Sequence, residues 1–173
     1  MKVRILPALL ICLVVAIMHA TAAAQTTSQP SDAQKAFDNM KNLAGSWQGT
    51  IMGISINVTI RLASSGTAIL HEATTDGGRP PNHEITMFYV DGDRLLATHF
   101  CDAGNRARFE GKMSQDGKTN DFNLLDVAGS TKGGLVKRLA FTMIDANKHV
   151  VEFTFIKPDG KPIELRGEFE RTK

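Results

Sequence analysis

The chain has 173 residues, of which 42% are hydrophobic and 22% are charged. This composition suits one globular domain that can bury a core. Lys2 and Arg4 are two of the 20 basic residues, and without this amino-terminal pair the basic residues equal the 18 acidic ones. We therefore expect neither nucleic acid nor an anionic membrane surface as a partner, because both are bound through many basic side chains.

The first 24 residues have the features of a secretory signal. A basic start precedes an apolar run over 5–17, and Ala22-Ala23-Ala24 offers a small-residue cleavage site. An apolar run of about 13 residues is shorter than the roughly 20 that a membrane-spanning helix needs. We predict a signal peptide over 1–24, export to the periplasm or the cell exterior, and no membrane insertion after cleavage.

The predicted mature chain begins with a flexible tether over 25–31, which is polar and lacks periodicity. A single domain over 32–173 follows. Cleavage would remove Cys12 and leave Cys101 as the one cysteine of the mature chain. An intramolecular disulfide is then excluded, so packing must stabilise the domain.

One helix is expected at the start of the domain. Ser31 or Asp32 can accept hydrogen bonds from its first free N–H groups. Ala33, Phe37 and Met40 follow at helical spacing on one face. Gly45 comes after the predicted end of this helix.

From Trp47 onward the hydrophobic period is two, most clearly over 54–62, where apolar and polar residues alternate without a break. Asp-Gly pairs recur along the chain at distances typical of hairpins. Tight hairpin turns need positive φ, which glycine adopts without steric cost. We predict no helix after residue 45 and about ten strands, over 46–52, 54–62, 68–75, 83–90, 93–101, 106–113, 120–127, 135–144, 148–156 and 162–172.

A meander of this many strands predicts an all-β, closed antiparallel barrel, because closure leaves no unpaired edge strand. A two-sheet sandwich fits the same pattern. A barrel of about ten strands has more interior than its side chains readily fill, which leaves room for one small ligand.

The sequence Gly45-Ser-Trp47-Gln-Gly49 resembles the G-x-W signature of lipocalin-like (calycin) barrels. Its G-x-W-x-G form is similar to nitrobindin-like proteins. Segments 83–84, 91–93, 98–101 and 104–105 also resemble a group of uncharacterised exported bacterial barrels. The resemblance implies the barrel fold and, through the nitrobindin-like proteins, haem as an alternative ligand held by a histidine near the carboxyl-terminal strands. The last strand has no histidine, so His149 on the strand before it is the candidate.

Barrel closure predicts a contact between the first and last strands. With an even number of antiparallel strands, the start of one lies beside the end of the other, which places Trp47 near Arg171. Arg171 lies on the apolar face of its strand, and stacking on the indole would stabilise it by about 0.5 to 2 kcal/mol. The alternative is an arginine at a frayed strand end with its charged group in water.

Glu84, His99 and Cys101 form the most reactive cluster that the sequence predicts. If Asp91-Gly92 is a two-residue turn, Glu84 stands opposite His99, and His99 and Cys101 share a face. A carboxylate beside an imidazole raises its affinity for a proton and can orient it.

The length of the next loop decides which face of the sheet carries this cluster. A three-residue loop over 102–104 turns His99 toward the apolar side of the following strand. A two-residue loop over 103–104 turns it toward the charged side. The sequence leaves both cases open.

We expect an exported barrel that binds a small, mostly apolar molecule, with Glu84, His99, Cys101 and Asn105 as ligand-binding residues and Trp47 with Arg171 closing the barrel. His99 and Cys101 alone are too few for a zinc site, so no metal ion is expected, and no cofactor apart from the haem alternative. A cavity enzyme with His99 as a general base oriented by Glu84 is a further alternative, although binding is favoured over catalysis. A scaffold without a ligand is another. The oligomeric state is left open.

Overall fold

The computed structural model describes residues 29–76 and 82–172. The predicted leader over 1–24 and the first part of the tether lie outside the described residues. Within the described part of the chain, no helix is both long and apolar enough to cross a bilayer. One helix, two short 3-10 turns and ten strands are present: α1 (Asp32–Met40), Lys41–Leu43, β1 (Gly45–Ile51), β2 (Ile54–Ala63), Ser64–Gly66, β3 (Ala68–Thr75), β4 (His83–Asp91), β5 (Arg94–Cys101), β6 (Asn105–Met113), β7 (Thr119–Gly129), β8 (Leu135–Asp145), β9 (Lys148–Ile156) and β10 (Pro162–Arg171).

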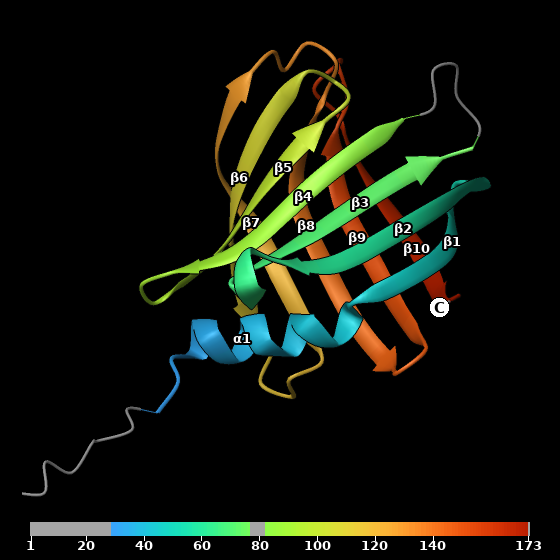
Figure 1. The fold of residues 1–173 in the computed structure, drawn as a ribbon. Helices are drawn as coiled ribbons and strands as arrows, with labels where there is room; N and C mark the ends of the chain where they lie inside the picture. Colours follow the sequence, from blue (N-terminus) through green and yellow to red (C-terminus); the bar gives the residue numbers. More distant parts are fainter. Residues whose placement is uncertain (1–28, 77–81, 173) are drawn as a thin grey trace, which may run out of the picture.

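The strands form one closed antiparallel barrel (Figure 1). Each strand pairs with its neighbour in sequence, and β10 pairs with β1. The predicted closed meander is confirmed, and the sandwich alternative is wrong. Closure gives every strand two hydrogen-bonded neighbours, which removes the exposed edges that a sandwich would keep.

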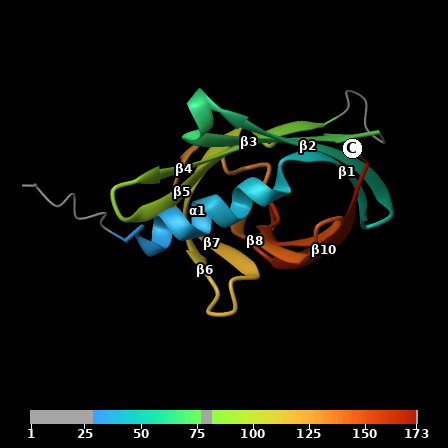
Figure 2. The same ribbon diagram turned by 60° about the horizontal axis from the view of Figure 1, so that its bottom comes forward.

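Helix α1 lies across one end of the barrel (Figure 2). The Ser31 side chain caps it by accepting a hydrogen bond from the backbone N–H of Gln34 at 3.1 Å. Its face of Ala33, Phe37 and Met40, joined by Ala36, is buried. The helix therefore covers this end, and we call the opposite end the open end.

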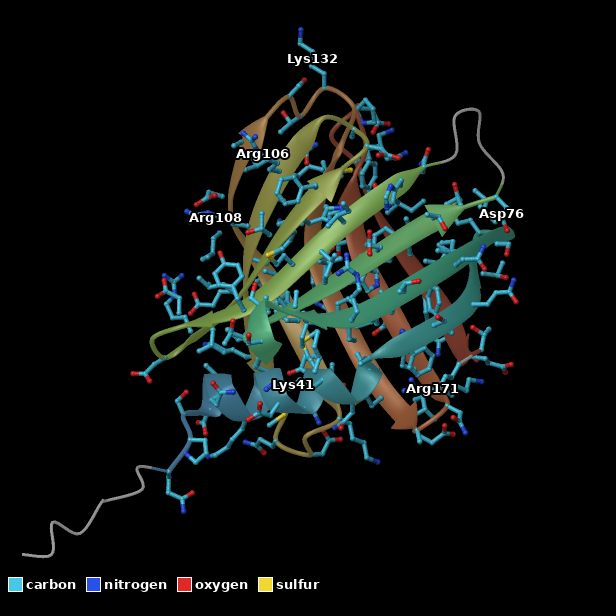
Figure 3. The ribbon with its side chains drawn as sticks, viewed as in Figure 1. Lys41, Asp76, Arg106, Arg108, Lys132 and Arg171 are labelled. Atoms are coloured by element: carbon cyan, nitrogen blue, oxygen red, sulfur yellow. The ribbon has the colours of Figure 1, made fainter. Side chains whose placement is uncertain are left out.

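The closing strands meet near the carboxyl end of α1. Trp47 pairs with Arg171 across β1 and β10, and the guanidinium carbon lies 4.1 Å from the centre of the Trp47 ring. Arg171 also donates hydrogen bonds to the carbonyls of Asn42, Ala44 and Ala146 at 2.9, 2.6 and 2.8 Å. Figure 3 shows Arg171 beside α1, with Lys132 at the open end. The arginine thus joins the segment between α1 and β1, the last strand and the β8–β9 turn.

Aromatic rings fill part of the barrel interior. Phe88 lies 5.1 Å from Phe122 and 5.5 Å from Phe141, measured between ring centres. Gly111 on β6 makes room for this cluster, because a Cβ atom there would lie 2.4 Å from the Phe122 ring. The remaining interior space lies toward the open end.

Candidate functional site

Two adjoining cavities occupy the interior on the side of the open end. The outer one has a volume of about 390 Å³ and the deeper one about 100 Å³. Their walls are mostly apolar, and both are bordered by Ile51, Ile56, Ala73, Glu84, Val136 and Phe153. A ligand entering at the open end would meet Glu84 at the junction between them.

Glu84, His99 and Cys101 meet at this junction. The Cys101 thiol donates to Glu84 Oε1 at 3.2 Å, and Glu84 Oε2 lies 3.8 Å from His99 Nε2. Glu84 and Cys101 are half-buried, whereas His99 is 5% exposed. On the other side of the imidazole, Nδ1 lies 2.9 Å from the Thr86 hydroxyl.

The register between β4 and β5 differs from the predicted one. Asp91 pairs with Arg94, so Gly92 and Asp93 form the turn, and Thr86 rather than Glu84 stands opposite His99. The predicted pairings of Glu84 with His99 and of Asn82 with Cys101 are therefore wrong. The error is a shift of two residues, which keeps every side chain on its predicted face because strand side chains alternate with a period of two.

The loop between β5 and β6 decides the facing of the cluster. Cys101 pairs with Asn105, which leaves the three-residue loop 102–104. His99 consequently stands opposite the buried Ala107 and faces the interior. Of the two cases that the sequence leaves open, the structure has the inward one. Gly104 adopts φ +86, the left-handed conformation that this loop needs.

Burial dominates the protonation of this cluster. The pKa of His99 is lowered because desolvation outweighs the nearby charges of Glu84 and Asp102. The Glu84 charge does raise the pKa of His99, as expected from the sequence. Burial lowers this pKa by more, so the net shift is downward. Burial, with the Glu84 charge, raises the pKa of the Cys101 thiol to about 12. At neutral pH the site therefore holds a neutral imidazole and a protonated thiol.

Asn105 borders neither cavity. Its side chain is buried, and Nδ2 donates to the carbonyls of Ser130 and Gly134 at 3.3 and 2.9 Å. Asn105 therefore ties the β7–β8 loop to β6. This role differs from the predicted one, and ligand binding by Asn105 stays a prediction.

His149 also lies away from the cavities, beside Trp47 near the α1 end. Its ring is fully buried, with ring centres 4.3 Å from Trp47 and 5.3 Å from Phe169. Haem ligation needs open space beside a ring nitrogen, and this packing leaves none. The residues around His149 do not fit haem in this arrangement.

The sequence interpretation missed His71, which borders the deeper cavity. It pairs with Thr86, which in turn pairs with His99, so these three inward-facing residues form a transverse row. Burial lowers the pKa of His71 to about 3, with smaller effects from His149 and His99. The alternation with Ile69 and Ala73 was the available signal, since residues i and i+2 share a face.

No protein-family model matches the chain, and no curated protein is significantly similar to it. The fold is similar to that of solved barrels. Rv2717c from M. tuberculosis has a TM-score of 0.62 and 14% identity over 80% of this chain and 98% of its own.

Two other solved structures are similar over a comparable length. A protein of the DUF3598 family from Nostoc punctiforme PCC 73102, of unknown function, has a TM-score of 0.37 and 14% identity over 77% of this chain and 48% of its own. EF1p2_mFAP2b bound to DFHBI has a TM-score of 0.40 and 13% identity over 79% of this chain and 99% of its own. At these identities the likeness concerns architecture: the chain has a closed antiparallel barrel fold similar to that of Rv2717c.

Proposed function

We propose that the protein acts after export as a carrier or sensor of a small, mostly apolar molecule bound inside the barrel. The observation that carries this proposal is the interior space of about 390 Å³, which adjoins a deeper one of about 100 Å³. Ligand sites in proteins commonly measure about 300 to 1,000 Å³, with apolar walls and a few convergent polar groups. The larger cavity has the size and lining of such a site.

The polar groups are placed to orient a ligand rather than to solvate it. Glu84 supplies acceptors at the junction of the two cavities, and His99 presents Nε2, which has no hydrogen-bond partner. A buried polar atom without a partner costs free energy, which a ligand hydrogen bond would offset. A ligand with an apolar body and one hydrogen-bonding group suits this arrangement.

Ala73 is the position at which to test the cavity, because it borders both parts. Ala73→Phe places a ring in the space that the ligand would occupy. The matched control is Thr74→Phe, since the Thr74 side chain points to the other face of β3, where its hydroxyl donates to the Asn57 carbonyl.

The measurement is the fluorescence of the neutral apolar probe N-phenyl-1-naphthylamine during titration with each purified protein. We expect saturable binding to the wild type and to Thr74→Phe, and affinity at least about tenfold weaker for Ala73→Phe, or about 1.4 kcal/mol. Absence of saturable binding to the wild type, or equal affinity for both variants, would contradict the proposal.

A further inference from the structure

We propose that Glu84, His99 and Cys101 bind a divalent ion of the zinc class, with the remaining coordination position facing the cavity. The three ligand atoms lie within 4.8 Å of one another. The sequence expectation of no metal ion considered His99 and Cys101 as the only donors at one place. The Glu84 carboxylate, which the sequence already placed in this cluster, is a third donor there.

Two of the donor distances are close to those around a tetrahedral ion. Donors around tetrahedral zinc lie about 3.3 to 3.8 Å apart, because the bonds to zinc are about 2.0 to 2.3 Å long. The carboxylate of Glu84 lies 3.8 Å from His99 Nε2 through one oxygen and 3.2 Å from Cys101 Sγ through the other.

His99 provides an independent indication of a ligand. Its side chain is 6% exposed, and Nε2 is buried without a hydrogen-bond partner. When Nδ1 carries the ring proton and donates to the Thr86 hydroxyl at 2.9 Å, Nε2 has a free lone pair directed at the cluster. A second hydrogen bond that orients the ligating imidazole is a regular feature of zinc sites.

The donor types select the ion. One nitrogen, one sulfur and one carboxylate oxygen suit zinc, whereas magnesium and calcium prefer oxygen alone. On binding, the Cys101 thiol gives its proton to water and forms the bond to the ion, so thiolate and carboxylate together balance the charge of the ion. Asp102 adds a negative field near His99 and Cys101. Three protein donors with a free position are typical of zinc sites that bind a further small molecule.

The test uses Co²⁺ as a spectroscopic substitute for Zn²⁺ with the metal-free, reduced full chain. Tetrahedral Co²⁺ with a thiolate ligand has strong visible bands and a sulfur-to-cobalt charge-transfer band. We expect both to saturate at one equivalent and to disappear when Zn²⁺ is added. Failure to develop these bands in the wild type would overturn the proposal.

Variants assign the donors. We expect Cys101→Ser to abolish the charge-transfer band, and Glu84→Gln and His99→Gln each to abolish saturable binding. Thr86→Val, which removes the partner of Nδ1, should weaken binding by about 10- to 100-fold. Circular dichroism of each variant identifies any that does not fold. Because Cys101 and Glu84 are only half-buried, substitutions there should disturb folding least.

Two controls make the assignment specific. Cys12→Ser changes the other cysteine of the chain, and His83→Asn changes a histidine that is 52% exposed and lies beside Glu72 rather than in the cluster. Both should bind like the wild type. A charge-transfer band that survives Cys101→Ser, or that is lost in Cys12→Ser, would overturn the proposed site. Because the titration contains no apolar molecule, its result is separate from that of the fluorescent-probe experiment.

Discussion

Arg171 shows how much one side chain contributes to barrel closure. Its guanidinium stacks on Trp47 and donates to three carbonyls from two other segments of the chain. The three carbonyls belong to residues near the ends of α1 and β8, where the ladder hydrogen bonds of the sheet do not reach. The sequence predicted the stacking from strand order, but these carbonyl contacts depend on how the helix packs.

We predict that Arg171→Ala lowers the free energy of unfolding by about 2 to 3 kcal/mol, because a cation–π contact and charge-assisted hydrogen bonds are lost together. Urea unfolding measures this change. Arg166→Ala is the control, since Arg166 is exposed and forms an ion pair with Glu168 at 2.9 Å; an exposed pair of this kind contributes about 0 to 1 kcal/mol. Equal losses in the two variants would contradict the role assigned to Arg171.

Among the strands, β6 shows why a residue without a side chain is needed beside the aromatic cluster. Gly111 is buried. The space that a side chain would take there is filled by the Phe122 ring of β7 and by Leu95 of β5. Alternation alone indicates only that residue 111 faces inward. The size that fits there follows from the neighbouring rings.

Gly111→Ala should destabilise the protein by about 1 to 3 kcal/mol, because a core that is already filled must move to admit a methyl group. The distance of 2.4 Å from the added Cβ to the Phe122 ring is too short without such movement. Lys112→Ala, at the exposed next position on β6, is the matched control. Chemical unfolding measures the stability of both variants. If Gly111→Ala were as stable as Lys112→Ala, this role of Gly111 would be wrong.

The hairpin of β4 and β5 illustrates which element-level features a sequence can predict. Asp91-Gly92 correctly indicated a turn, but the turn consists of Gly92 and Asp93. A shift of the β4–β5 register by two residues puts Thr86 instead of Glu84 opposite His99. The same side chains still face the interior, because side chains alternate with a period of two. The faces of the strands were thus predictable, and the partners of His99 were not.

The barrel as a whole holds several histidines in a neutral state. Burial lowers the pKa of His149 to about 4 and that of His71 to about 3. The charge of Arg171 lowers the pKa of His149 further. His149 and His99 do the same for the pKa of His71. In the unfolded chain a histidine titrates near pH 6.5. Between these values the unfolded state binds protons that the folded state does not.

The free energy of unfolding should therefore be fully retained above about pH 6.5 and fall as the pH is lowered toward 4, by up to about 1.4 kcal/mol per pH unit for each such histidine. Urea unfolding at pH 7, 6 and 5 measures the slope. His149→Leu removes one titrating group, so its stability should fall less steeply than that of the wild type. Identical slopes would show that His149 does not contribute.

Helix position, strand ranges and barrel closure could be derived from the order of residues alone, because capping, alternation and turn formation depend on near neighbours in the chain. The contact of Glu84 with Cys101, the cavity beside His71 and the use of Asn105 to hold a loop were decided only by the tertiary structure. These features depend on register across hairpins and on which interior space the aromatic rings leave empty. Both are set by contacts between strands, where a change at one turn moves every later pair.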